Sequence, residues 1–374
     1  MEKVAIITIS VGLLNYGNRL QNYALQQFLI GKGHAPETIQ YKPKYENLEI
    51  SLSSGHTRRK LSYYISWIKK KAYVIRNRKL GKEKKLKFDI FTKTKIIWSE
   101  DKYTSDSDFS NFSKRYDCAI VGSDQVWNPY WEGTNYIYYL GFMPEEKRIA
   151  YAASFGVLKI PDNRIEFMKN AIKGITHLSC REQQGVELVE ELTGRVASHV
   201  LDPVFLLSKK EWEKIEICPT YFKIYESYVL IYFLGEYSPE LNKAIKFYKK
   251  KGYNIIYLDK PDAHRTIFAS PEEFIYLIHH ASLVCTDSFH GTAFSILFNV
   301  PFWCFRRSLD LGKQQDMSSR LTSILCLFGC SERMFSDRTS LSNINMNFER
   351  INEILIAEIK KSEEFLDASF LALK

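Results

Sequence analysis

The stretch Leu283-Val-Cys-Thr-Asp-Ser-Phe-His-Gly-Thr292 is a short apolar run followed by a polar turn and the start of a helix. A short, continuous apolar run is typical of a strand buried on both faces of a parallel sheet. The same order of strand, turn and helix returns at residues 4–32, 177–193 and 228–251. This alternation predicts an α/β fold with mostly parallel sheets.

The pattern runs through the first half of the chain and restarts after Pro203. The segment between the halves, residues 208–225, is charged and has no strand alternation. We therefore expect an N-terminal domain over residues 1–205 and a C-terminal domain over residues 206–345. Residues 346–374 form a final helix, expected to pack back on the N-terminal domain. Two such units bind ligands in the cleft between them, beyond the carboxyl ends of the strands.

The chain has 374 residues and a net charge of +9, concentrated in one segment. Residues 57–87 hold thirteen Lys or Arg and one acid, Glu83, so the rest is slightly acidic. From Leu61 to Arg78, apolar and aromatic residues recur at helical spacing. Such a helix suits an anionic membrane surface, or it packs its apolar face on its own domain. No nucleic-acid motif accompanies the charge, so nucleic acid is not predicted as a partner.

The sequence also indicates the cellular compartment in which the protein is expected. No apolar stretch is long enough to span a membrane, and the N-terminus lacks the pattern of a secretory signal. The seven cysteines form no CxxC pair, which favours reduced thiols. We expect a cytoplasmic protein, peripheral on the inner face of the membrane if the basic helix binds lipid. His279 and His280 lie in an expected helix without HExxH, so no metal site is predicted.

Two polar segments follow expected strands in the N-terminal half. Residues 15–22 open a helix, where Gly17 permits a close turn and free N–H groups could hold an anion. The alternative is a simple turn capped by Asn18. In residues 122–129, Asp124 could accept a proton from a sugar hydroxyl and Trp127 could stack on a sugar ring. The alternative is a capped turn in which Asp124 bonds backbone donors.

Two further segments carry charged or titratable groups. Arg181 ends an expected strand, and its guanidinium suits a carboxylate or phosphate, unless it forms a structural ion pair with Glu182. His290 lies between a strand end and a helix expected to begin at residue 291 or 292. Asp287 could orient this imidazole, although a histidine there can also be structural. The cations Lys313 and Arg320 flank a polar loop within reach of the cleft.

Taken together, these segments resemble the polysaccharide pyruvyl transferase family, which is mainly bacterial. The matching motifs, in order, are Asn15-Tyr16-Gly17-Asn18-Arg19-Leu20-Gln21-Asn22, Val121-Gly122-Ser123-Asp124-Gln125-Val126-Trp127-Asn128, Ser179-Cys180-Arg181-Glu182, Leu201-Asp202-Pro203, Thr286-Asp287-Ser288-Phe289-His290-Gly291 and Ser319-Arg320-Leu321. The resemblance implies two Rossmann-like domains facing a cleft, similar to the GT-B glycosyltransferases.

The resemblance also implies a reaction. Pyruvate would pass from phosphoenolpyruvate to a sugar of a surface-polysaccharide precursor, as a cyclic ketal on two hydroxyls. His290 would be the acid and Asp124 the base for the acceptor. The donor would be held by Arg181, Ser288, His290, Gly291, Arg320 and Lys313, and the acceptor by Tyr16, Gly17, Asn18, Asn22, Ser123, Gln125 and Trp127. Phosphoenolpyruvate is a co-substrate, so no cofactor is expected; the acceptor would be a lipid-linked or free oligosaccharide.

One position departs from the family pattern. Ser288 stands where some members have an arginine, so Lys313 or Arg320 would have to supply the missing cation. A first alternative is a glycosyltransferase of similar fold that uses a nucleotide sugar. A second is a non-catalytic, glycan-binding or membrane-associated assembly protein, in which His290 and Arg181 would be replaceable.

Overall fold

The computed structural model describes residues 1–9, 14–41, 81–104, 107–130, 136–220, 227–260, 265–307 and 319–373. The predicted basic helix from Leu61 to Arg78 lies outside these residues, and so does Lys313.

The N-terminal half forms a seven-stranded sheet in which all paired strands are parallel. The strand order is β3-β2-β1-β4-β5-β6-β7. The central strands β1 and β4 are short apolar runs, buried as expected for a sheet covered on both faces. The strands are β1 (Lys3–Ile7), β2 (Ala35–Tyr41), β3 (Trp98–Tyr103), β4 (Cys118–Val121), β5 (Arg148–Ala153), β6 (His177–Cys180) and β7 (Ser198–His199), and the helices are α1 (Tyr16–Gly31), α3 (Phe112–Arg115), α4 (Asp162–Lys173) and α5 (Gln183–Thr193), with a further helical stretch over residues 81–95.

The C-terminal half repeats the arrangement with five parallel strands in the order β10-β9-β8-β11-β12. A connector that contains α6 (Lys209–Glu213) leads into it from the first sheet. Its strands are β8 (Tyr228–Tyr232), β9 (Asn254–Leu258), β10 (Thr266–Ile267), β11 (Leu283–Thr286) and β12 (Phe302–Cys304), and its helices are α7 (Pro239–Lys250), α8 (Pro271–His279), α9 (Phe289–Phe298), α10 (Ser319–Leu327) and α11 (Phe348–Leu371).

In each sheet, successive strands are first added toward one edge and then, after one crossover, toward the opposite edge. In the first sheet this switch point lies between β1 and β4, and in the second between β8 and β11. Loops that leave neighbouring strands in opposite directions open a crevice at such a switch point. The motifs around Asp124 and His290 follow β4 and β11, so the topology places each at the switch point of its own sheet.

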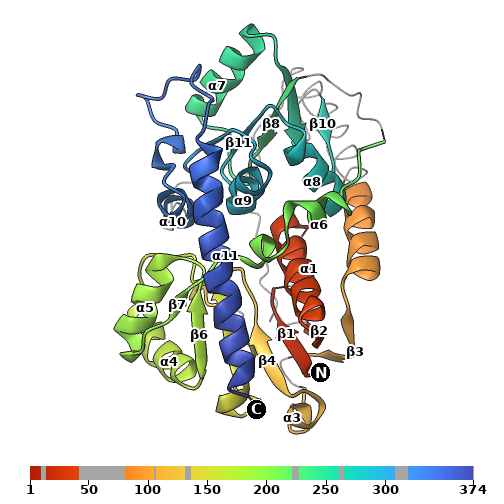
Figure 1. Cartoon of the computed structure of the whole chain (residues 1–374), viewed down its shortest axis with the longest axis vertical. Helices are drawn as coiled ribbons and strands as arrows, with labels where there is room; N and C mark the ends of the chain where they lie inside the picture. The colour runs from red at the N-terminus through yellow and green to blue at the C-terminus, as the bar shows by residue number, and fades with distance from the viewer. Residues whose placement is uncertain are drawn as a thin grey trace, which may run out of the picture.

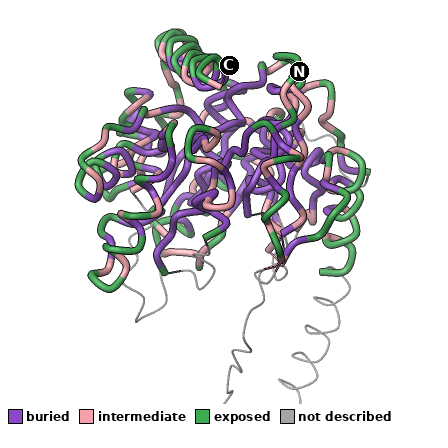
Figure 2. Tube along the Cα trace, turned by 90° about the horizontal axis from the view of Figure 1, so that it is seen from below, coloured by how far each residue is buried: buried purple, intermediate pink, exposed green. Residues whose placement is uncertain are grey.

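The two sheets are joined by packed aromatic residues and by α11. Tyr16 at the start of α1 stacks on Phe274 of α8, with ring centroids 4.5 Å apart. Figure 1 shows α11 running from the second sheet to the first. Its beginning packs in the same apolar cluster as α8 and α9, and its end, at Leu366 and Phe370, packs against β1 and β4. In Figure 2 its outer side is largely exposed while the interior of both halves is buried.

The helical residues 81–95 also contact the second half of the chain. Lys84 donates to Asp259 at 2.8 Å, and Lys87 donates to Glu273 at 2.7 Å. Burial raises the pKa of the Asp259 carboxyl, although Lys84 opposes this shift. These two lysines of the basic segment therefore serve contacts within the protein.

The predicted fold class is confirmed: the protein is α/β, with two Rossmann-like parallel sheets in a GT-B-like arrangement. Two details differ from the sequence prediction. The strands β3 and β10 were not predicted, and α9 begins at Phe289 rather than at residue 291 or 292. No helix in the described part of the chain is both long and apolar enough to cross a membrane.

Candidate active site

His290 lies in the first turn of α9 and reaches across to the first half of the chain. The side chain of Ser288 caps this helix by accepting from the backbone N–H of Gly291 at 3.4 Å. The imidazole rests on Gly17, where a Cβ atom would lie 1.9 Å from Nδ1 of His290. Only a glycine permits this approach, so the turn before α1 and the start of α9 together set the position of the ring.

Asp202 faces the other side of this imidazole. It follows β7 and caps a short 3-10 helix, accepting from the N–H of Val204 at 3.1 Å. Its Oδ2 atom lies 3.5 Å from Nε2 of His290 and accepts from Ser123 at 2.7 Å and from Arg181 at 2.8 Å. Burial alone would raise the pKa of Asp202, but the charges of His290 and Arg181 outweigh it and hold the pKa well below its usual range. Asp202 is therefore an ionised group whose carboxylate faces the imidazole of His290.

Arg181 directly follows β6, and its side chain is fully buried. Its Nε donates to Glu182 at 3.0 Å, and the ring of Phe289 covers the guanidinium at 4.3 Å. Burial alone would lower the pKa of Arg181, but Glu182 and Asp202 reverse the shift and raise it. Within the described part of the chain, Nη2 has no hydrogen-bond partner. One donor of this ion-paired arginine is thus left unused.

Arg320, in the first turn of α10, lies close enough to Arg181 to be repelled by it. The side-chain amide of Gln125 faces it, and with the amide oxygen turned toward the guanidinium it accepts from both terminal nitrogens at 2.9 Å. Burial lowers the pKa of Arg320 to about 10, and the charge of Arg181 adds to this effect. Its Nε finds no acceptor among the described residues. Arg320 is therefore a half-buried cation, with its Nε buried, that lacks the carboxylate contacts of Arg181.

Asp124 follows β4 with its backbone in the left-handed region, at a φ of 81°. Its two carboxylate oxygens accept from the side chain of Asn18 at 2.7 Å and from the N–H of Gln125 at 2.9 Å. Asp124 also contributes to the electrostatic environment of both Arg181 and Arg320. The predicted residues Gly17, Asn18, Ser123, Asp124, Gln125, Arg181, His290 and Arg320 therefore meet at one junction between the two sheets.

Asp287, which follows β11, has a different role from the one expected. Its carboxylate accepts from the backbone N–H groups of Leu234 and Gly235 at 2.7 and 2.8 Å and pairs with Arg307 at 3.1 Å. These contacts join the loops after β8 and β11. The structure thus gives the carboxylate beside His290 to Asp202, not to Asp287.

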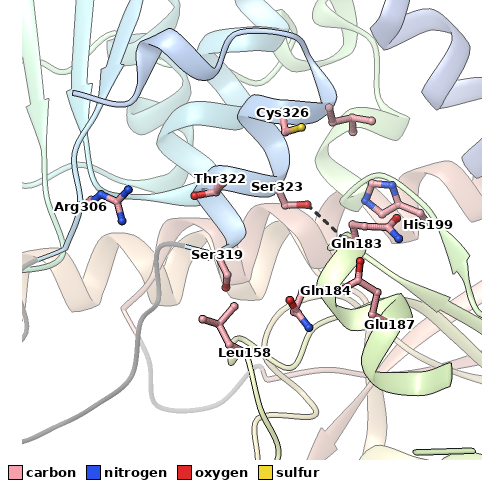
Figure 3. A pocket seen from close by; sticks show the side chains of 11 residues that line it. Leu158, Gln183, Gln184, Glu187, His199, Arg306, Ser319, Thr322, Ser323 and Cys326 are labelled. Atoms are coloured by element: carbon pink, nitrogen blue, oxygen red, sulfur yellow. Dashed lines mark hydrogen bonds between the residues drawn. The ribbon is translucent and has the colours of Figure 1, made fainter. Parts of the chain in front are cut away.

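A cavity of about 530 Å³ opens beside this junction, between α5 of the first half and α10 of the second (Figure 3). The backbone N–H of Gln183 donates to Ser323 Oγ at 3.3 Å across it. The cavity adjoins the junction along the chain, because Gln183 closely follows Arg181 and Ser319 precedes Arg320. Amide, hydroxyl and apolar groups dominate its lining: Leu158, Gln183, Gln184, Glu187, His199, Arg306, Ser319, Thr322, Ser323, Cys326 and Leu327.

With this geometry in place, comparison with known families is decisive. Residues 15–308 match the polysaccharide pyruvyl transferase family. The chain belongs to this family. The match covers every part of the junction except Arg320, which lies just beyond it. The protein is therefore a transferase, and the family implies a polysaccharide acceptor.

Solved structures resemble the chain only distantly, and no curated protein matches its sequence. UDP-GlcNAc 2-epimerase from Neisseria meningitidis matches with a TM-score of 0.49 at 8% identity, covering 99% of this chain and all of that one. ADP-heptose LPS heptosyltransferase II from E. coli matches with a TM-score of 0.37 at 12% identity, covering 96% and 98% of the two chains. These likenesses carry no further argument about this member of the pyruvyl transferase family.

All residues predicted to bind the acceptor are buried, and three of them make contacts within the framework of the protein. Trp127 is 0% exposed and its indole N–H donates to the backbone of Tyr138, so it has no surface to offer a sugar. Tyr16 is packed between the halves and donates to Asp259 at 3.0 Å. Asn22 accepts from Thr38 at 2.7 Å inside the first half. In this family member all three hold the framework behind the junction.

Two predicted donor residues also have structural contacts. The hydroxyl of Ser288 caps α9, and Gly291 packs so closely on Thr286 that a Cβ atom would lie 2.5 Å from its Oγ1. Sequence reasoning gave no role to Asp202, although the Leu201-Asp202-Pro203 motif was part of the family resemblance. An Asp-Pro pair after a strand is a common helix start, so the motif alone did not reveal a partner for His290.

Proposed function

We propose that the protein transfers a pyruvyl group from phosphoenolpyruvate to two hydroxyls of one sugar in a polysaccharide or its precursor, forming a cyclic ketal. One observation carries this proposal beyond family membership. A histidine backed by an ionised, buried carboxylate lies beside two arginines, each of which keeps an unbonded nitrogen among the described residues. This arrangement suits an anionic donor that must be protonated.

The donor site is formed by Arg181 and Arg320. Two guanidinium groups that repel one another are stabilised by an anion placed between them. Phosphoenolpyruvate supplies a phosphate and a carboxylate, both of which can accept from Arg181 Nη2 and Arg320 Nε. Arg320 takes the place of the cation that Ser288 does not provide.

His290 protonates the methylene carbon of phosphoenolpyruvate, which gives the neighbouring carbon oxocarbenium character. Asp202 supports this step because its carboxylate, 3.5 Å from Nε2, holds the imidazole in position. A first sugar hydroxyl then adds to the cationic carbon and gives its proton to Asp124. The resulting intermediate has a new methyl group and still carries the phosphate.

Ring closure completes the reaction. The bond between this carbon and the phosphate oxygen breaks, and its electron pair leaves with the phosphate. Asp124 gives its proton to the departing phosphate. The second hydroxyl attacks the same carbon and gives its proton to His290, which is thereby restored. The products are the ketal and inorganic phosphate, and no resident cofactor takes part.

The acceptor sugar is proposed to enter through the cavity between α5 and α10. Its amides and hydroxyls, including Gln184, Thr322 and Ser323, can bond neutral sugar hydroxyls, and Leu158 and Leu327 can contact the C–H face of a ring. Gln184→Ala and Thr322→Val should raise KM for the acceptor and leave KM for phosphoenolpyruvate unchanged.

A lipid-linked acceptor would place the protein at an anionic membrane surface. The cations of residues 57–87 suit such a surface. Replacing Lys69, Lys70 and Lys71 by glutamate should then weaken binding to phosphatidylglycerol vesicles. Unchanged vesicle binding would leave a free oligosaccharide as the proposed acceptor.

The reaction is tested by incubating the full-length protein with phosphoenolpyruvate and a panel of free sugars. Phosphate release and the methyl signal of a ketal in NMR spectra are followed together. Wild type should produce both with at least one sugar, and His290→Gln neither. Release of a nucleoside diphosphate from nucleotide sugars, with no phosphate from phosphoenolpyruvate, would instead establish a glycosyltransferase. Glycan binding that survives in His290→Gln, with no turnover in wild type, would indicate a non-catalytic protein.

A further inference from the structure

Two histidines and a glutamate meet where the connector passes the end of α8. His279 is the last residue of α8, His280 follows it, and Glu216 comes from the segment after α6. Nδ1 of His279 lies 2.9 Å from one oxygen of Glu216, and Nε2 of His280 lies 3.2 Å from the other. One ligand atom from each side chain falls within 4.8 Å of the other two.

These distances are close to those of a zinc site. Zinc binds imidazole nitrogen and carboxylate oxygen at about 2.0–2.2 Å, which in a tetrahedron separates ligand atoms by about 3.4 Å. Small rotations of the three side chains would open the present contacts to that spacing. The His280 side chain is 42% exposed, so water can reach a fourth position.

A second carboxylate supports the same assignment. If His279 binds a metal through Nδ1, its Nε2–H points away from the ion and needs an acceptor. Glu213 Oε1 lies 3.7 Å from this Nε2. A carboxylate behind a metal-bound histidine fixes its tautomer and orientation in many zinc sites. The Tyr276 ring, with its centroid 4.1 Å from that of His280, restricts the other imidazole.

We propose that Glu216, His279 and His280 form a site for a divalent transition-metal ion, with zinc as the expected ion. Imidazole and carboxylate ligands with an open position suit zinc better than magnesium, which prefers oxygen ligands alone. The ion fastens the connector between the two sheets to α8. A backbone hydrogen bond from Ile217 to Glu272, 3.2 Å long, already joins the same elements. The site is separate from the proposed transfer reaction, since none of its residues belongs to the His290 junction.

Without a metal, the same side chains make a hydrogen-bonded cluster of two rings on one carboxylate. Metal uptake by variants distinguishes a metal site from this hydrogen-bonded cluster. The full-length protein is stripped with a chelator, and Zn²⁺ binding is measured by competition with a chromophoric chelator. Stripped samples are also titrated with Co²⁺, whose visible spectrum reports tetrahedral ligation. His177→Ala controls for loss of a histidine elsewhere, and Cys218→Ser for capture by the nearby exposed thiol.

Wild type and both controls should bind one equivalent of Zn²⁺ and give a tetrahedral Co²⁺ spectrum. His280→Ala and Glu216→Gln should lose this binding. Glu213→Gln should weaken it by about 10–100-fold, as loss of a carboxylate behind a ligand does. Zn²⁺ should raise the unfolding temperature of wild type but not of His280→Ala, an exposed position at which the fold is retained. No uptake by wild type, or equal uptake by His280→Ala, would overturn the proposal.

Discussion

Arg181, which is buried, and Arg320, which is half-buried, bring two guanidinium groups to the same junction, but their surroundings differ. Arg181 lies among carboxylates: Glu182 and Asp202 both accept from it, and they raise its pKa despite burial. The group that faces Arg320 is the neutral amide of Gln125, and burial lowers the pKa of Arg320 to about 10. Arg181 is in direct contact with two carboxylates, whereas the charges of Glu182 and Asp124 act on Arg320 without a direct ion pair.

Because their surroundings differ, Arg181 and Arg320 are expected to have different roles. A buried ion pair whose charges are matched holds its neighbours in place, and here it orients the Asp202 carboxylate toward His290. A buried cation without a matching anion is unfavourable in the free protein and gains most when an anion binds. Arg181 thus mainly positions the catalytic pair and offers the donor its free Nη2, while Arg320 is proposed to provide most of the attraction for the donor.

The largest expected effect follows from removing Arg181. In Arg181→Gln, the buried carboxylates of Glu182 and Asp202 lose their counter-charge, which costs about 3–5 kcal/mol of unfolding free energy. Urea unfolding measures the change, with the exposed Arg338→Gln as a control. Wild-type stability in Arg181→Gln would mean that the ion pairs do not hold the junction.

Arg320→Gln should behave in the opposite way. Losing a charge-assisted contact to the donor should weaken phosphoenolpyruvate binding about 10- to 100-fold. Unfolding free energy should stay the same or rise, because a group whose pKa is lowered on folding opposes folding while it is charged. Calorimetry and urea unfolding on the same samples test both parts. A loss of stability as large as that of Arg181→Gln would remove the distinction between the two arginines.

Gln125→Glu should make the surroundings of Arg320 resemble those of Arg181. The new carboxylate would pair with Arg320, compete with the donor and raise the pKa of the guanidinium. We expect the affinity for phosphoenolpyruvate to fall about tenfold, because the new carboxylate repels the anionic donor. Thermal stability should increase, because the same carboxylate pairs with Arg320. Gln183→Glu, on the rim of the cavity, is the matched control. Tighter donor binding in Gln125→Glu would contradict the proposed role of Arg320.

The smallest effect is a change with pH. Arg320 attracts the donor only while protonated, so affinity should fall as pH rises through its pKa of about 10. At that pH half of the molecules have lost the charge, which weakens apparent binding about twofold. The decline should be absent from Arg320→Gln. An equal decline in both proteins would assign it to another group.

Sequence alone predicts most of the fold because parallel strands buried on both faces are short apolar runs between helices. The prediction fails where this signal is weak. Residues 98–103 are mainly polar and form the edge strand β3, and β10 has only two residues. The start of α9 was misplaced because Ser288, not a residue nearer Gly291, caps the helix.

The junction was only partly accessible from sequence. Position after a strand end singled out Asp124, Arg181 and His290, which the topology does bring to one place. Nothing local shows that His290 rests on Gly17 or faces Asp202, since these contacts join residues 273 and 88 positions apart. Trp127 was misassigned for a related reason, because an aromatic ring in a polar motif can equally well belong to the core. The Glu216 cluster was missed because its carboxylate lies 63 positions before His279 in the sequence.

Calorimetric titration of phosphoenolpyruvate into wild type and Arg320→Gln tests the central claim most directly, with unfolding of both proteins measured in parallel. The account predicts saturable binding to wild type, binding weakened at least about tenfold in Arg320→Gln, and no loss of stability. Absence of binding to wild type, or equal binding to both proteins, would contradict a donor site at the unpaired arginine.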